Sequence, residues 1–286
     1  MISQMFDIVT WVKNGSWCLP RTLLQLEKAL PSEDLHRKIA IDDASTDDSV
    51  KILKSFEWEV YKNQGKGISA GANYALQLVD CPFFMSFEQD LFLALNWFDN
   101  VTGLVKGNTA VASGIRFSDK AKTVGDIEKY AYKKYLMETK LAPYLQDRKE
   151  SAFLLGKTLD NTFYNTKIIR TIGGFPVMPS SNVIDTILAH QIRKNGFKWT
   201  VNPKVQSIHL RKNFTQNLRH QYWYSSALKE AKLKEPKLNL SLKQEIRKFG
   251  ASPMMGFVMS FKMKNPKIFF VYPLMRFYRL RGFLSA

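Results

Sequence analysis

An apolar run that stops at two adjacent carboxylates constrains the fold of this chain more than any other feature. Ile39 and Ile41 have the branched side chains of a buried strand, and Asp42 and Asp43 follow them directly. Ser45 or Thr46 then stands where a side chain can cap the first amides of a helix. In open α/β sheets ligands bind at such strand exits, because the next helix points its amides at the crevice. The run therefore predicts a ligand site, with a simple helix cap as the alternative.

Strand-like and helix-like segments alternate through the first 210 residues. The expected strands lie at residues 7–12, 39–41, 59–61, 83–87, 111–117, 159–164 and 199–201, the last one leading through Pro203 to His209. The expected helices lie at residues 19–30, 50–56, within 63–79, 124–144, 166–172 and 182–195. This alternation predicts a mostly parallel sheet with right-handed crossovers. Two acidic strand exits, at residues 42–43 and 88–90, would then lie along one sheet edge.

The second acidic exit has the spacing of a metal site. Glu88 and Asp90 can hold a hard divalent cation, which prefers oxygen ligands and can bridge a diphosphate. A pair of this kind is often only solvated surface. Here an apolar strand precedes the pair, and Leu91 and Phe92 follow it, so this position favours the metal site.

The formal net charge of +17 is concentrated at one end of the chain. Residues 1–210 hold 26 Lys and Arg against 22 Asp and Glu, whereas residues 211–286 hold 16 against 3. A charge of this size is typical of nucleic-acid-binding proteins, which is the non-enzymatic alternative. The acidic strand exits argue against it, because they would repel phosphates unless a metal ion is present. We therefore expect no nucleic-acid partner.

The remaining features indicate a reducing compartment and no membrane-spanning helix. Cys18 and Cys81 lie in no disulfide framework or metal-thiolate pattern. Residues 1–12 have neither a basic start nor an apolar core, so we expect no cleaved signal. The longest uncharged apolar run, residues 249–261, contains Gly and Pro and is shorter than the roughly 20 residues of a spanning helix. We expect a cytoplasmic protein.

Six motifs in order make the sequence resemble glycosyltransferase family 2, whose members have the GT-A nucleotide-sugar fold. The matches are D-D-A-S-T-D-D-S at residues 42–49, the loop with Asn63, Gly67 and Asn73, E-Q-D at 88–90, G-G-F at 173–175, I-D at 184–185, and Pro203 with His209. The resemblance implies a Rossmann-like, mostly parallel mixed sheet flanked by helices in a catalytic domain of residues 1–210. Residues 211–286 would form a basic, aromatic-rich helical extension.

The resemblance implies a donor nucleotide site built from five residues of this chain. Asp43, together with Asp42, would accept a hydrogen bond from the nucleotide base. Asn73 and Glu88 would belong to the same donor site. Lys66 would supply the positive charge that many relatives carry beside the helix asparagine.

The resemblance also assigns the metal ion and the chemistry. Asp90 would be the chief ligand of Mn²⁺ or Mg²⁺, with His209 as a second one. Asp185 would be the general base that takes the proton of the acceptor hydroxyl. The implied reaction is an inverting single displacement of a hexose from a UDP-, GDP- or dTDP-sugar to a hydroxyl acceptor. The chain departs from the family's usual residues at Glu88, Ala72 and Ile184, which keeps a catalytically silent nucleotide-binding protein as the alternative.

Residues 211–286 add two expectations. The Q-x-x-R-W motif of processive synthases is incomplete, because Gln221, Tyr222 and Trp223 stand without the Arg, so we expect single additions. Apolar residues interrupted by Lys and Arg predict an interfacial segment on an anionic membrane surface. A helix pair packed on the catalytic domain is the alternative. A peripheral position on the cytoplasmic face would suit a glycan or polyprenyl-linked acceptor.

Overall fold

The chain folds into two compact units, seen in a computed structural model that describes residues 5–119, 122–140, 154, 156–178, 183–227 and 241–285. The sheet unit comprises Met1–Arg116 and Gly156–Leu210, and the helical unit comprises Phe117–Leu155 and Arg211–Ala286. The middle segment 117–155 thus groups with the C-terminal segment, a grouping that the order of the sequence does not reveal. The assignment of residues 1–210 as the catalytic domain stays a prediction.

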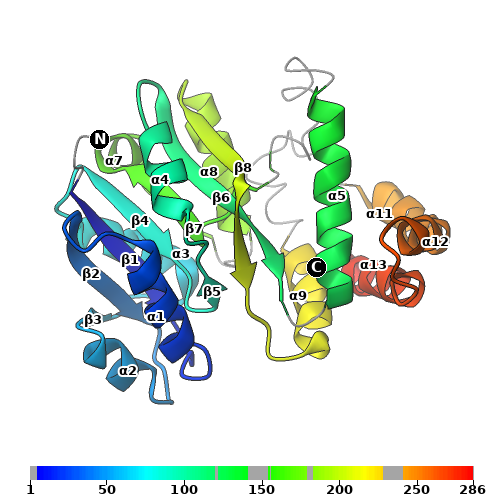
Figure 1. Cartoon of the computed structure of the whole chain (residues 1–286), viewed down its shortest axis with the longest axis horizontal. Helices are drawn as coiled ribbons and strands as arrows, with labels where there is room; N and C mark the ends of the chain where they lie inside the picture. Colours follow the sequence, from blue (N-terminus) through cyan, green and yellow to red (C-terminus); the bar gives the residue numbers. More distant parts are fainter. Residues whose placement is uncertain are drawn as a thin grey trace. The chain divides into compact units, whose positions relative to one another are not determined.

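The first half of the sheet is parallel, as the alternation of elements predicts (Figure 1). The strands pair in the order β3-β2-β1-β4, with bounds β1 (Phe6–Val12), β2 (Leu35–Asp42), β3 (Glu59–Lys62) and β4 (Phe83–Phe87). The connecting helices are α1 (Leu19–Ala29), α2 (Ser49–Ser55) and α3 (Gly67–Leu78). Helix α1 has Pro20 in its first turn. Proline is tolerated there because the backbone N–H that it lacks would have no acceptor within the helix. Parallel pairing places the carboxyl ends of these strands at one edge.

The second half of the sheet contains antiparallel pairs, so the sheet is mixed. Its order continues β4-β7-β6-β8-β5, with bounds β5 (Leu91–Phe92), β6 (Thr109–Ser118), β7 (Asn161–Asn165) and β8 (Lys198–His209). Strand β8 runs through Pro203 as one element, whereas the sequence predicts a strand that ends at residue 201. The shorter helices are α4 (Trp97–Val101), the 3₁₀ turn η1 (Thr102–Leu104), α7 (Thr166–Thr171) and α8 (Ile184–Lys194). Residue 182, the expected start of α8, lies outside the described residues.

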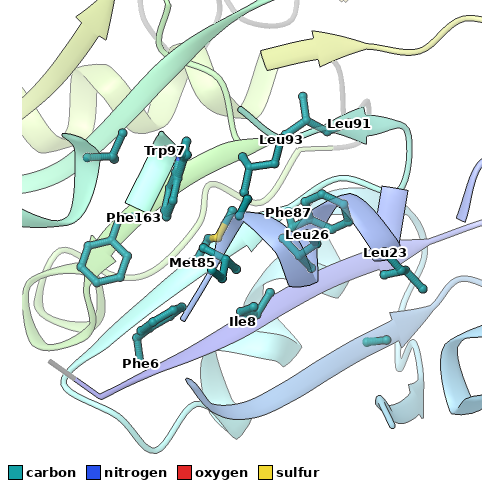
Figure 2. Packing of buried hydrophobic residues seen from close by; sticks show 14 of the residues in the cluster. Phe6, Ile8, Leu23, Leu26, Met85, Phe87, Leu91, Leu93, Trp97 and Phe163 are labelled. Carbon is teal, nitrogen blue, oxygen red and sulfur yellow. The ribbon is translucent and has the colours of Figure 1, made fainter. Parts of the chain in front are cut away.

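A buried apolar cluster holds the strands against α1 (Figure 2). All seven residues of β1 are buried, as expected for a central strand that is covered on both faces. The cluster joins Phe6 and Ile8 of β1 to Leu23 and Leu26 of α1. The ring of Phe6 meets the ring of Phe163 in β7 edge-on, with centroids 5.6 Å apart. The strands that carry the acidic exits therefore stand on a rigid base.

The helical unit has a separate and smaller core. Its helices are α5 (Lys122–Lys140), α9 (Phe214–Ser226), α11 (Leu242–Gly250), α12 (Ser252–Lys262) and α13 (Ile268–Ser285). The buried apolar residues of this core are Val124, Ile127, Leu218, Met259, Ile268 and Met275. In the described part of the chain, no helix combines the length and the apolar character that a bilayer crossing requires. Residues 141–144 of the expected 124–144 helix, and the Lys-rich residues 228–240, lie outside the described residues.

Candidate active site

The two acidic strand exits meet at the carboxyl edge of the parallel strands. Val12 of β1 is in register with Asp42 of β2, and β1 also pairs with β4. Lys13 links the exits, because its backbone N–H donates to Gln89 Oε1 at 3.0 Å and its Nζ donates to Asp43 Oδ2 at 3.1 Å. The expectation that both exits lie along one sheet edge is confirmed.

Asp43 accepts hydrogen bonds from three groups around the start of α3. Its Oδ1 accepts the N–H of Gly67 at 3.0 Å and the side-chain amide of Asn63 at 2.9 Å, while Lys13 Nζ reaches Oδ2. Partial burial alone would raise the pKa of Asp43, but these hydrogen bonds together lower it below its ordinary value. An ionised carboxylate only accepts hydrogen bonds, so Asp43 suits a ligand that presents N–H groups.

The small polar residues after the two carboxylates brace the loop that follows β1. Both Asp42 oxygens accept the N–H of Ser45 at 3.2 Å, and Ser45 Oγ accepts the N–H of Asn14 at 3.0 Å. Thr46 donates its N–H to Asn14 Oδ1 at 2.8 Å. The prediction that Ser45 or Thr46 caps the next helix is wrong: α2 follows Asp48 at its N-cap and has no side-chain cap bond. The hydroxyls serve the neighbouring loop instead.

The two donor-site residues predicted on α3 have different surroundings. Lys66 is exposed and directly precedes Gly67, whose N–H reaches Asp43. Asn73 lies in the middle of α3, where its Nδ2 donates to the carbonyls of Ser69 and Phe175 and its Oδ1 accepts the Phe175 N–H at 2.9 Å. Asn73 therefore ties α3 to the G-G-F turn, and a direct contact with nucleotide stays a prediction.

Glu88, Asp90 and His209 form a group that can hold a metal ion. One ligand atom from each side chain lies within 4.8 Å of the others, and His209 Nε2 lies 3.0 Å from Asp90 Oδ2. The pairing of β5 with β8 produces this proximity, because Leu91 is in register with His209. The Leu210 N–H also donates to the Asp90 carbonyl at 2.7 Å. Two carboxylates and an imidazole are a donor set that suits a divalent cation.

Arg116 and Asp160 connect this group to the interior of the sheet unit. The guanidinium of Arg116, on β6, forms an ion pair with the buried carboxylate of Asp160, next to the start of β7. The same guanidinium contacts Nδ1 of His209 through Nη1. This contact orients the imidazole ring of His209 from the side opposite Asp90.

Asp185 is the acidic residue in the first turn of α8. Burial raises the pKa of its carboxyl to about 6. Two effects oppose this increase, namely the hydrogen bond that the carboxyl accepts from the Thr186 N–H at 2.7 Å and the charge of Arg116. The charge of Asp160 adds to the increase. A carboxylate with this pKa is ionised at pH 7 and remains a better proton acceptor than an ordinary Asp.

The sequence of the chain matches one family model, that of glycosyl transferase family 2, over residues 7–173. The chain belongs to this glycosyltransferase family. The match spans more than half of the chain, includes the acidic strand exits and Asn73, and ends at Gly173, the first residue of the G-G-F turn. No curated protein sequence matches this family 2 glycosyltransferase.

Solved structures with the same fold share little sequence with this glycosyltransferase. The mannosyltransferase PcManGT from Pyrobaculum calidifontis, solved with GDP-Man and Mn²⁺, has a TM-score of 0.63 at 12% identity and covers 95% of this chain and 74% of its own. S. aureus TarS with UDP-GlcNAc has a TM-score of 0.57 at 11% identity, with 98% and 91% covered. Glucosyl-3-phosphoglycerate synthase from Mycobacterium tuberculosis, solved with Mn²⁺ and UDP, has a TM-score of 0.54 at 12% identity, with 79% covered in both. The predicted GT-A fold is confirmed.

A second group of metal-binding residue types lies at the opposite, amino-terminal edge of the parallel strands of this glycosyltransferase. Asp7, His36 and Cys81 approach one another there. The Asp7 carboxylate accepts hydrogen bonds from His36 Nδ1 at 2.9 Å and from the backbone N–H groups of Asp80 and Cys81 at 2.8 and 3.1 Å. Burial and the Asp7 charge raise the pKa of the Cys81 thiol to about 12, so it stays protonated. This group is explained as a hydrogen-bonded brace of the turn before β4.

Proposed function

We propose that this protein is an inverting, metal-dependent hexosyltransferase that moves single sugars from a nucleoside-diphosphate sugar to a hydroxyl acceptor. The observation that carries the proposal is the group of Glu88, Asp90 and His209, which can hold a cation and whose His209 contacts Arg116. The charge of the same Arg116 acts on Asp185, whose pKa is about 6. A cation site suits a departing diphosphate, and a raised carboxylate pKa suits proton transfer from a hydroxyl.

The donor atoms of the acidic group fit the metal that the proposal requires. Carboxylate oxygens and an imidazole nitrogen suit Mn²⁺, and carboxylates also suit Mg²⁺. When bound, the ion would supply positive charge that stabilises the departing nucleoside diphosphate. PcManGT and the M. tuberculosis synthase were both solved with Mn²⁺, which supports this choice of cation.

The side chains of the chain itself divide the remaining work. Asp43, with Asp42 beside it, accepts N–H groups of the nucleotide base, and Lys66 brings positive charge to the start of α3. Asp185 accepts the proton of the acceptor hydroxyl while that oxygen attacks the anomeric carbon. Attack on the face opposite the departing diphosphate inverts the configuration at this carbon. Arg116 keeps His209 oriented toward Asp90.

The acceptor that we propose is a glycan or polyprenyl-linked glycan, reached at the cytoplasmic face of a membrane. The basic residues 211–286 support this choice, because they would hold the protein at an anionic surface where such acceptors reside. A UDP-, GDP- or dTDP-sugar is the donor class.

The proposal is tested by measuring thermal unfolding with UDP, GDP, dTDP and CDP, each with and without Mn²⁺ or Mg²⁺. We expect one nucleotide to raise the unfolding midpoint only when metal is present, because a bound ligand stabilises the folded state by mass action. Asp90→Ala should abolish the metal dependence. The matched control is Asp99→Ala, which removes an exposed carboxylate of α4 and should leave the response intact.

Three outcomes contradict parts of this proposal. A lack of response to every nucleotide would exclude donor binding. Nucleotide binding without turnover, unchanged in Asp185→Ala, would support the catalytically silent alternative. Long homopolymer made from one donor would contradict single additions.

A further inference from the structure

We propose that α12 and α13 form a hairpin surface that inserts shallowly into the interfacial layer of an anionic lipid bilayer. The hairpin surface consists of Met254, Phe257, Phe261, Phe270, Leu274 and Phe277. This proposal deepens the proposed function, because it names the residues that would contact the membrane. It rests on the proposed function only for the choice of a membrane as the partner. The helices pack against each other within the helical unit (Figure 1).

Helix α12 is apolar on two opposite faces, and only one of them is buried. Ser252, Gly256 and Met259 face the core of the helical unit. Met254, Phe257 and Phe261 are 76%, 58% and 79% exposed. Their spacing of three and four residues places these three side chains on one side of the helix. An exposed apolar stripe of this kind marks an interaction site, since single scattered apolar residues are the norm on protein surfaces.

Helix α13 repeats this arrangement. Ile268 and Met275 are buried, whereas Phe270 is 72% exposed, and Leu274 and Phe277 follow at four and three residues with exposed side chains. Each helix of the hairpin therefore packs through one face and presents a second apolar face to its surroundings. Aromatic and long aliphatic side chains on such a face are typical of helices that lie in a membrane interface.

The hairpin is held in one shape before any partner binds. The N–H groups of Met263 and Asn265 donate to carbonyls of α12, and Lys264 adopts a left-handed conformation with φ of 51°. Gly256 allows the close crossing, because a Cβ at this position would lie 3.1 Å from the carbonyl oxygen of Phe269. Asn265 Nδ2 also donates to Asp126 of α5 at 2.8 Å. The exposed side chains are thus presented by a rigid element, which lowers the entropic cost of binding.

The charge around the hairpin selects an anionic partner. Residues 246–286 contain eight Lys and Arg and no Asp or Glu. Lys264 and Lys267, in the turn between the helices, are exposed next to the phenylalanines. A second copy of the chain would bring two such positive surfaces face to face, which Coulomb repulsion opposes. Anionic headgroups neutralise the charge while the acyl boundary accepts the rings, so a lipid surface fits both features.

The test is sedimentation of the full chain with vesicles of phosphatidylcholine alone or mixed with phosphatidylglycerol. We expect binding to the anionic vesicles. Phe261→Ser with Phe270→Ser should weaken it by roughly tenfold for each phenylalanine, because the buried ring area is lost. Lys264→Gln with Lys267→Gln should weaken it by about fivefold for each lysine. The matched control is Leu24→Ser with Leu95→Ser, which removes two exposed apolar residues from the sheet unit and should leave binding unchanged.

Far-UV circular dichroism and the nucleotide-plus-metal unfolding shift are measured on the same variants without vesicles. An intact shift together with weakened vesicle binding supports the hairpin surface. Full vesicle binding by the phenylalanine variant overturns insertion and leaves only surface electrostatics. Sedimentation equilibrium that shows a dimer broken by the phenylalanine variant, with no vesicle binding, overturns the lipid partner in favour of a second copy. If the chain binds vesicles but responds to no nucleotide, the proposed function fails while the hairpin proposal stands.

Discussion

At the scale of single residues, Asp185 differs from a carboxylate on an exposed helix surface in its pKa, which burial and the neighbouring charges set together. Burial raises its pKa to about 6, and the attraction of Arg116 does not cancel this increase. A group whose pKa is higher in the folded than in the unfolded protein loses stability as pH rises between the two values. Ionised Asp185 therefore destabilises the folded state at neutral pH, as is common for groups kept for catalysis.

Asp185→Asn is expected to lower activity and to raise stability. Loss of a general base reduces kcat by about 10²- to 10⁴-fold. At pH 8 the variant should gain on the order of 2 kcal/mol in the free energy of unfolding, because a partly buried carboxylate with a raised pKa is replaced by a neutral amide. The gain should shrink as pH falls below 6 and vanish below about pH 3, where Asp185 is protonated in both the folded and the unfolded state. Urea unfolding at several pH values measures this trend.

The control for this prediction is Asp99→Asn, an exposed carboxylate that should change neither activity nor the pH trend. A variant of Asp185 that stays fully active would remove the base assignment. One that loses activity without a pH-dependent gain would instead contradict the raised pKa.

Arg116 and Asp160 are the site residues that the motifs do not reveal. A cation within the apolar strand candidate 111–117, and an acid within the strand candidate 159–164, are the signals that the sequence offers. Such charges are found inside proteins when they are paired. Their pairing joins β6 to the start of β7, and no local pattern predicts which distant charge a partly buried arginine will meet. The acidic strand exits could be predicted because each follows its own apolar run directly.

At the scale of elements, the metal group depends on a strand that sequence patterns cannot predict. Strand β5 has two residues, too few for an alternating pattern, and it pairs with the end of β8. This pairing brings Asp90 next to His209. Strand β8 also contains Pro203, which normally argues against a central strand. In contrast, β1, β4, α1 and α3 could be predicted, because each contains an apolar pattern of its own in the sequence.

The Asn73 brace makes an element-scale prediction. Asn73→Ala should reduce the free energy of unfolding by about 2–3 kcal/mol, because the N–H and carbonyl of Phe175 lose their partners. Asn100→Ala is the matched control, since the Asn100 side chain is exposed and its amide donates to the nearby carbonyl of Asn96. Chemical unfolding of the two variants measures the difference.

Nucleotide titration of the same variants separates bracing from direct contact. If Asn73 only joins α3 to the G-G-F turn, the folded variant should bind nucleotide and metal with nearly unchanged affinity. If the folded variant binds nucleotide more than about tenfold more weakly, Asn73 contacts the sugar donor directly, as the resemblance implies. A tenfold change in affinity corresponds to the loss of about one hydrogen bond to a ligand.

At the scale of the whole molecule, charge and surface character divide between the two units. The acidic strand exits and Asp185 belong to the sheet unit, whereas the exposed phenylalanines of α12 and α13 belong to the helical unit. Of the net charge of +17, residues 211–286 carry most. We therefore expect each unit to bind a different ligand, the sheet unit a metal with a nucleotide and the helical unit an anionic surface.

Hydrogen–deuterium exchange measured with each ligand separately should show this division. Nucleotide with Mn²⁺ should slow amide exchange at residues 13–16, 42–49 and 88–92, because binding suppresses local opening at the carboxyl edge of the sheet. Anionic vesicles should slow exchange in α12 and α13 and leave those loops unchanged. Asp90→Ala should remove only the first effect, and Phe261→Ser with Phe270→Ser only the second. Protection of the sheet-edge loops by vesicles alone would contradict independent ligand sites on the two units.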